Sequence, residues 1–154
     1  MKVVVLRLGH GRTPWADAAC ADYLQRLPRA LPVEEQRLEP SPFRGDIEAV
    51  RMAEAGRILA VLREGDRLIA VDERGERPTT EAFAGWIGEA AQGSVRRLVF
   101  ALGGPYGHGP AVRTMAWRVL ALSSLVTNHE IARVMLVEQL YRASTLLWGG
   151  AYHH

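Results

Sequence analysis

Short hydrophobic runs recur along the chain, and longer segments with helical spacing separate them. The runs at 3–8, 68–72 and 98–102 are typical of buried strands, because they are rich in Val, Ile, Leu and Phe. Segment 33–38 mixes polar and hydrophobic residues, so we expect it at the edge of a sheet. A fifth strand is expected at 119–122.

The segments between these runs predict helices. One begins after Thr13-Pro14 and ends near Leu27, a short one begins near Val112, and the longest extends from about 129 to 147, where Gly149-Gly150 ends it. Its hydrophobic positions predict a stripe that contacts both its own sheet and a second subunit: Ile131, Val134, Met135, Leu140, Tyr141 and Leu147. The expected capping residues of the four main helices are Thr13, Asp46, Thr80 and Asn128. Alternating strands and helices predict an α/β fold with a mostly parallel sheet and helices on both faces.

Length and composition favour a single cytoplasmic domain, residues 1–154. The chain is 48% hydrophobic, and its first hydrophobic run is too short for a signal sequence or a membrane span. The lone Cys20 lies among alanines in a helical segment, which predicts a core position and a reducing compartment. A net charge of only +2 argues against an affinity supplied by phosphate contacts alone. Every basic residue except Lys2 is arginine, which suits phosphate contacts and also fits a coding bias.

Two glycine-containing or polar segments follow predicted strands, where ligands bind in open α/β sheets. Val71-Asp72 ends one strand, and Leu102-Gly103-Gly104 ends another. The glycine pair permits either a tight turn or close approach of a ligand to the backbone, and it is neither a phosphate loop nor a dinucleotide turn. Segment 122–127 mixes apolar and hydroxyl side chains before Asn128, so it is either an ordinary connection or a wall for an adenine ring.

Other polar residues also admit two readings. Glu138 and Arg142 are four residues apart, which suits a surface ion pair or a pair within a site. The histidines at positions 10, 108 and 129 lack metal-ligand spacing, and no metal site is predicted.

The order and spacing of Gly103-Gly104, segment 122–129, segment 138–142 and the final Tyr152-His153-His154 resemble the RlmH family of SPOUT-class methyltransferases. The resemblance implies a trefoil knot at the C-terminal end and a homodimer. It also implies methylation of N3 of a pseudouridine in a large-subunit rRNA hairpin at the ribosomal subunit interface, with the assembled ribosome as the preferred substrate. The implied S-adenosylmethionine site comprises Val71, Gly103, Gly104, Leu122, Ser123, Ser124, Leu125, Val126 and Thr127.

The same resemblance assigns roles near the reacting base. Tyr152, His153 and His154 would orient the pseudouridine, with His153 the first candidate to accept the N3 proton. Arg142 would contact RNA phosphate or substrate, and Glu138 would support it.

The chain also departs from many members of that family. It has Tyr106 in place of Glu, Asn128-His129-Glu130 in place of Pro-His-Pro and His154 in place of a terminal Arg, forms that look more plant- and cyanobacteria-like. Arg113 and Arg133 are candidates to replace the missing terminal arginine. Two other functions stay open: a SPOUT methyltransferase of another RNA such as tRNA, and a ribosome-binding protein without catalysis.

Overall fold

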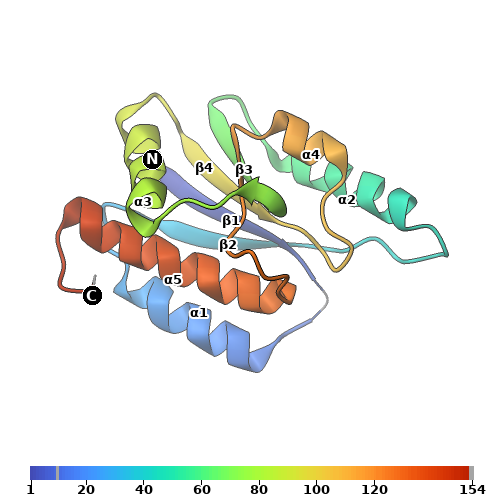
Figure 1. Cartoon of the computed structure of the whole chain (residues 1–154), viewed down its shortest axis with the longest axis horizontal. Helices are drawn as coiled ribbons and strands as arrows, with labels where there is room; N and C mark the ends of the chain where they lie inside the picture. Colours follow the sequence, from blue (N-terminus) through green and yellow to red (C-terminus); the bar gives the residue numbers. More distant parts are fainter. Residues whose placement is uncertain (10, 153–154) are drawn as a thin grey trace.

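The fold of this chain is a parallel β-sheet with helices on both faces (Figure 1). The structure is a computed structural model that describes residues 1–9 and 11–152. Its strands are β1 (Lys2–Leu8), β2 (Val33–Leu38), β3 (Asp66–Glu76), β4 (Arg97–Leu102) and β5 (Arg118–Leu120). Its helices are α1 (Pro14–Arg26), α2 (Ile47–Val61), α3 (Thr80–Gln92), α4 (Pro110–Met115) and α5 (His129–Trp148). The α/β prediction is confirmed, and most element ends lie within two residues of the expected ones.

The strands are ordered β2-β1-β4-β3-β5, and every neighbouring pair is parallel. β2 lies at an edge, as its mixed polarity predicted. The carboxyl ends of β3 and β4 are neighbours in the centre of the sheet, because Val71 pairs with Leu102. This arrangement brings the two predicted strand-end segments to one edge of the sheet.

Alternate residues of the strands point to two separate hydrophobic layers. On one face, Val3, Val5 and Phe100 pack with α3 and α5, and α1 lies beside α5. On the other face, Val4 and Leu6 pack with α2 and α4. Figure 1 shows α1, α3 and α5 on one side of the sheet and α2 and α4 on the other. Because each fully buried Val, Leu or Phe contributes about 1.5–3 kcal/mol, both layers hold the helices firmly against the strands.

Side chains cap three of the helices. Asp46 accepts hydrogen bonds from the backbone N–H groups of Glu48 and Ala49 at 2.9 and 3.2 Å, and Asn128 accepts one from Glu130 at 2.8 Å. Thr79, rather than the predicted Thr80, caps α3 by accepting from Ala82 at 3.2 Å.

The prediction of Thr80 as the cap was wrong because its hydroxyl has another role. It donates to Gln139 Oε1 at 3.1 Å and so ties α3 to α5. Thr13 precedes α1 as expected, but its side chain forms no capping hydrogen bond. Its backbone N–H instead donates to Asp17 Oδ2 at 3.2 Å.

The buried face of α5 differs from the predicted stripe. Of the predicted residues Leu140 is fully buried, whereas Ile131 is 45% exposed. The residues that α5 buries completely or nearly so are Arg133, Leu136, Val137, Leu140, Ala143 and Ser144. The predicted contact of the stripe with its own sheet is confirmed for Leu140, and its contact with a second subunit stays a prediction. The charged Arg133 also lies on the buried face.

Arg133 joins three elements through carboxylates. Its Nε donates to Glu35 Oε1 of β2 at 2.6 Å, and its Nη1 donates to Asp17 of α1 at 2.7 Å and to Glu130 of α5 at 3.0 Å. The hydrogen bonds to Glu35 raise the pKa of Arg133, and the hydrogen bond from Arg133 lowers the pKa of Asp17. Arg133 is therefore enclosed and paired, and the expectation that it replaces an RNA-binding arginine is wrong.

Cys20 lies on the buried face of α1 and has no exposed surface. Burial raises the pKa of its thiol to about 11. The prediction that it fills the core is confirmed. In the part of the chain that the structure describes, no helix is both long and apolar enough to cross a membrane.

Candidate functional site

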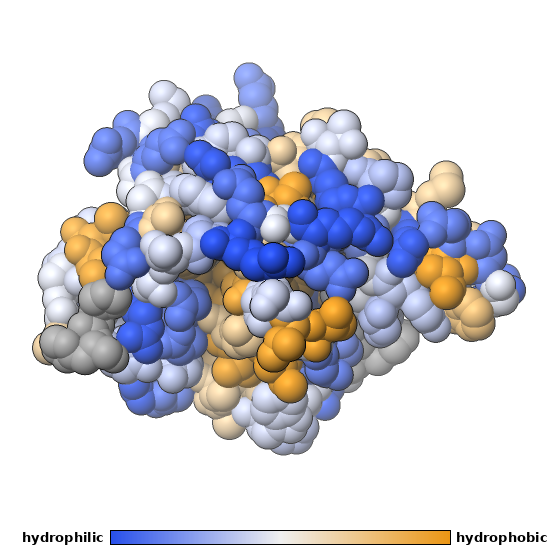
Figure 2. All heavy atoms as spheres, in the orientation of Figure 1, coloured by the Kyte–Doolittle hydropathy of each residue, from blue (hydrophilic) through white to orange (hydrophobic). Residues whose placement is uncertain are grey.

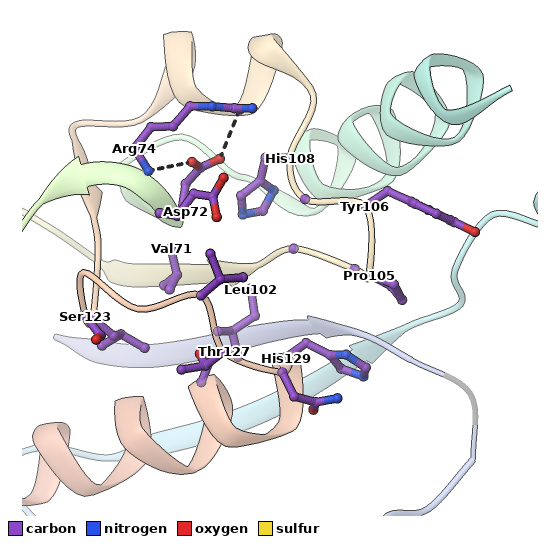
Figure 3. Close-up of a pocket in the computed structure, with 18 of the residues that line it drawn as sticks. Val71, Asp72, Arg74, Leu102, Pro105, Tyr106, His108, Ser123, Thr127 and His129 are labelled. Carbon is purple, nitrogen blue, oxygen red and sulfur yellow. Dashed lines mark hydrogen bonds and ion pairs between the residues drawn. The ribbon is translucent and has the colours of Figure 1, made fainter.

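A cleft of about 550 Å³ opens beyond the carboxyl ends of β3 and β4 (Figure 3). Its floor is formed by Val71-Asp72 and Leu102-Gly103-Gly104, the strand-end segments that the sequence singled out. The other lining residues are Ile47, Arg51, Glu73, Arg74, Pro105, Tyr106, Gly107, His108, Leu120, Leu122, Ser123, Leu125, Val126, Thr127, Asn128, His129 and Ala132. A volume of this size is typical of sites for small molecules.

The loop after β4 is closed tightly enough to require glycine. The N–H of Gly107 donates to the Gly104 carbonyl at 2.9 Å, and Gly107 has a φ of +74°. A Cβ atom on Gly103 would lie 3.3 Å from the Gly107 backbone, and one on Gly104 would lie 2.9 Å from Glu54 Oε2. The two readings of the glycine pair therefore both apply: it makes a tight turn and presents bare backbone to the cleft.

Segment 122–128 forms the opposite wall. The Leu125 N–H donates to Ser123 Oγ at 2.9 Å, and the side chains of Leu125 and Val126 are 76% and 82% exposed. Figure 2 shows hydrophobic side chains gathered at the surface over the segment that leads into α5. Of the six residues predicted in this wall, five line the cleft, and Ser124 does not. The wall combines apolar side chains with free backbone groups.

A buried ionic group forms the third side of the cleft. The Arg74 N–H donates to Asp72 Oδ1 at 3.0 Å (Figure 3). Behind Asp72, Arg113 Nη1 donates to Asp72 Oδ2 at 3.2 Å and to the His108 carbonyl at 2.9 Å. His108 Nε2 donates to the Ala101 carbonyl at 3.0 Å. Burial lowers the pKa of His108, so its ring is neutral near pH 7.

Arg113 does not itself line the cleft, but these contacts hold two residues that do, Asp72 and His108. His108 was expected to have no metal-ligand role, and its place in the cleft was not predicted, although its position in the glycine-rich segment after β4 was a usable signal. Ile47 and Arg51 were missed altogether, because they come from α2 and reach the cleft only in the folded chain. Arg51 Nε donates to the Tyr106 carbonyl at 2.7 Å.

The residues predicted to act on the base lie elsewhere, at the C-terminal end of α5. Gly149 has a φ of +87°, and a Cβ atom on Gly150 would lie 2.9 Å from Thr145 Cβ, so the chain turns back tightly on the helix. The Tyr152 hydroxyl then lies 3.2 Å from that of Tyr23. This hydrogen bond is the main reason that the pKa of Tyr152 is raised to about 12.

Arg142 and Glu138 belong to the same group of side chains. Arg142 Nη2 donates to Glu138 Oε1 at 2.6 Å, which raises the pKa of Arg142, and the guanidinium lies 4.7 Å from the centre of the Tyr152 ring. We call Tyr23, Glu138, Arg142 and Tyr152 the C-terminal cluster. The other two predicted residues, His153 and His154, lie outside the described part of the chain.

The cleft and the C-terminal cluster are not one site within one protomer. Asn128 caps the first turn of α5 beside the cleft, and Arg142 lies fourteen positions further along. At 1.5 Å per residue the helix separates them by about 20 Å. The structure thus brings the predicted cofactor residues except Ser124 together in the cleft, and it leaves Glu138, Arg142 and Tyr152 at the opposite end of the helix.

The cleft has the chemistry to hold an amphipathic cofactor. Leu102, Leu122 and Ala132 offer apolar contacts to a ring, and the backbone of Gly103-Gly104 offers donors and acceptors. The ionisable side chains Glu73, Arg74 and His129 line the same space and suit charged groups. Within residues 1–9 and 11–152, no group of three or more His, Cys, Asp or Glu side chains could hold a metal ion.

Comparison with known proteins gives a match along the whole chain. The family model described as "Predicted SPOUT methyltransferase" matches residues 1–153. A protein of Brucella anthropi is 50% identical over 158 residues, which cover 99% of each chain, and one of Trichlorobacter lovleyi is 38% identical over the full length of both chains. A third, from Verminephrobacter eiseniae, is 40% identical over 99% of each chain. All three carry the name "Ribosomal RNA large subunit methyltransferase H".

Proposed function

We propose that this chain, which belongs to the SPOUT methyltransferase family, methylates large-subunit rRNA with S-adenosylmethionine as the methyl donor. The observation that carries the proposal is the glycine-floored cleft, which matches the expected cofactor residues in a chain aligned over its full length with rRNA methyltransferases. The finer target, N3 of a pseudouridine in the assembled ribosome, rests on the sequence resemblance. A ribosomal substrate would place the protein in the cytoplasm. We also propose that residues 1–154 form a single domain.

The cleft residues fit the cofactor chemically. S-adenosylmethionine supplies a methyl group on a positively charged sulfur, together with an adenine ring and an amino-acid end. Segment 122–127 would hold the ring between apolar side chains and backbone groups, and Gly103 and Gly104 would allow the backbone to approach it closely. Arg74 and Glu73 would face the charged amino-acid end.

The C-terminal cluster would orient the base rather than remove its proton. Methylation of N3 requires that its proton leaves as the carbon–nitrogen bond forms. With a pKa near 12, Tyr152 stays protonated near neutral pH and can donate a hydrogen bond, but it is a poor proton acceptor. We therefore keep His153 as the proton acceptor and assign Tyr152 an orienting role, with Arg142 facing RNA phosphate.

A homodimer would bring the two ends of α5 into one site. Since about 20 Å of helix separates the cleft from Arg142 in one chain, the tail of a second chain would complete the first chain's cleft. The apolar side chains exposed near the cleft support a partner surface, since Leu125, Val126 and Ile131 are 76%, 82% and 45% exposed.

We also propose that the chain is knotted in the region of the cleft. β5 pairs first with Ile69–Val71 of β3 and again with Glu76, and the Ala121 N–H donates to the Glu76 carbonyl at 2.8 Å. A Cβ atom on Gly75 would lie 2.5 Å from the Val119 carbonyl oxygen. Such close passage of two chain segments is what a threaded loop requires.

The deciding experiment incubates the protein with labelled S-adenosylmethionine and, in parallel, assembled ribosomes lacking the modification, isolated large subunits and bulk tRNA. We expect label as 3-methylpseudouridine with assembled ribosomes. Label in tRNA would move the activity to another RNA. Tight cofactor binding without label in any RNA would favour a ribosome-binding protein that lacks catalysis.

A further inference from the structure

Two aromatic side chains lie together at the rim of the cleft. The rings of Phe43 and Tyr106 are 5.5 Å apart between centroids and tilted by 32°. In Figure 3, the Tyr106 side chain points away from Ser123 and Thr127. Its ring contacts that of Phe43, a residue of the segment that precedes α2. Phe43 is 53% exposed. We call Phe43 and Tyr106 the aromatic rim.

Helix α2 holds both loops that carry the aromatic rim. Arg51 Nε donates to the Tyr106 carbonyl at 2.7 Å, and Glu54 Oε1 accepts from the Ser41 N–H at 3.0 Å. A Cβ atom on Gly109 would lie 2.9 Å from the Arg51 carbonyl oxygen, so the loop after β4 is pressed against the helix. The rim is thus fixed in place before any ligand binds, which reduces the entropy cost of binding.

Glu54 connects the rim to the floor of the cleft. Its residue is 3% exposed, and its Oε2 has no hydrogen-bond partner among the described residues. That oxygen lies 2.9 Å from where a Cβ atom of Gly104 would be. The Glu54 carboxylate therefore lies between the loop of Phe43, which it holds through Ser41, and the glycine pair, where it occupies the space that a Cβ atom of Gly104 would need.

Two guanidinium groups lie near the rim, one of them paired with a carboxylate. Arg51 lines the cleft and pairs with Glu48 at 2.6 Å, and Arg44 is exposed directly after Phe43. Figure 2 shows hydrophobic atoms beside hydrophilic ones at the end of the molecule where α2 begins. Aromatic faces next to guanidinium groups are the chemistry that recognises unpaired bases and their phosphates in RNA.

We propose that the aromatic rim stacks an unpaired base of the RNA substrate, with Arg44 beside the adjoining phosphate. The inference rests on the proposed function, because the cleft next to the rim would hold the methyl donor. Stacking tolerates any base, so the rim would add affinity and hold the hairpin open while the target base enters the cleft. Tyr106 stands where many members of the family have a glutamate. The substitution adds an aromatic ring and removes a negative charge that would repel RNA.

The test uses the full-length protein and an rRNA hairpin that carries fluorescent 2-aminopurine at unpaired positions. The Phe43→Ala/Tyr106→Ala double variant is compared with the original and with Met52→Ala, an equally apolar side chain of α2 that is 70% exposed and outside the cleft. We expect the double variant to bind the hairpin about tenfold more weakly and to lose the quenching of 2-aminopurine. Tyr106→Phe, which keeps the ring, is expected to retain most of that quenching.

Three results would overturn the inference. The first is a double variant whose hairpin affinity and quenching are unchanged. The second is a loss of S-adenosylmethionine affinity, measured by calorimetry, as large as the loss of hairpin affinity. The third is conversion of a dimer to a monomer in light scattering, which would make the rim a subunit contact. The binding readout does not depend on methyl transfer. If the original protein quenches the hairpin but transfers no methyl group to assembled ribosomes, the proposed function would therefore be rejected and the rim would remain.

Discussion

The two ends of α5 differ in how the chain builds chemistry around them. At the N-terminal end, the cleft depends on glycines, backbone groups and space, since added Cβ atoms would collide with neighbouring residues. At the C-terminal end, the cluster depends on side chains that contact one another through hydrogen bonds and through a guanidinium above an aromatic ring. The first should therefore fail when atoms are added, and the second when atoms are removed.

The comparison also shows what each end of α5 lacks. The cleft contains polar backbone and buried charges, but its neutral histidine already donates to a carbonyl. The C-terminal cluster contains orienting groups but lies about 20 Å along the helix from the cleft. A methylation site that needs both would have to combine two chains.

The largest effect is expected from removal of the tail after Ala151. Loss of Tyr152 and the two histidines should lower the methylation rate by about 100-fold or more, since it removes the orienting and proton-accepting groups. Calorimetry should find the same S-adenosylmethionine affinity as in the full chain. Full activity of the shortened protein would remove the tail from the mechanism.

Mixing two proteins that are each nearly inactive at low cofactor concentration sharpens the same comparison. Protomers that lack the tail are exchanged with protomers whose cleft carries Gly104→Val, and the methylation rate of the mixture is measured. If the tail of one chain serves the cleft of the other, random dimers should recover about a quarter of the original activity. A mixture that stays inactive, although dimers exchange, would place cleft and tail of the same chain together.

Gly104→Val by itself should weaken cofactor binding by about tenfold, because the added atoms meet Glu54 and overpack the floor of the cleft. The matched control is Gly56→Ala in α2, where an added Cβ atom has no heavy atom within 4 Å. Both proteins should melt cooperatively in circular dichroism. Unchanged calorimetric affinity in the valine variant would separate the glycine pair from the cofactor.

Arg142→Ala should lower kcat/KM for ribosomes by about fivefold, the size of one charged contact to phosphate. The cofactor affinity should not change, because Arg142 lies at the far end of α5. Lys2→Ala is the control, since Lys2 forms an exposed ion pair with Glu34 at the amino end of β1. Equal rates for all three proteins would reduce Glu138 and Arg142 to a surface ion pair.

The smallest effect concerns pH and the Tyr23–Tyr152 hydrogen bond. Because the pKa of Tyr152 is raised from 10.0 to about 12 in the folded state, the stability it contributes is present below pH 10 and is lost as pH rises through 12. Tyr23→Phe should bring the pKa of Tyr152 closer to 10, measured by ultraviolet titration, and should reduce that alkaline loss. An unchanged titration would mean that Tyr23 does not hold Tyr152.

The strands and the cleft floor could be predicted because their signals are local. Val71-Asp72 and Gly103-Gly104 each end a hydrophobic run, and the parallel pairing of β3 with β4 follows from alternating strands and helices. Asn128 was equally visible, since a capping residue lies next to the helix that it caps.

The remaining features depend on contacts between distant segments. Arg51 enters the cleft from a helix on the other face of the sheet, and the partners of Arg133 come from β2, α1 and α5 itself. The burial of Arg133 could not be predicted, because no local pattern reveals three carboxylates that meet in the fold. Thr79 and Thr80 are both good caps, and only the position of Gln139 decides between them.

The buried Cys20 is a natural probe of local unfolding at α1. It is the one cysteine of the chain, and a thiol with a pKa near 11 and no exposed surface cannot react with a disulfide reagent while α1 stays in place. The rate of thiol labelling would therefore count how often α1 leaves the protein. The same count taken with cofactor or ribosomes present would reveal how far binding at one end of α5 holds its neighbouring helix closed.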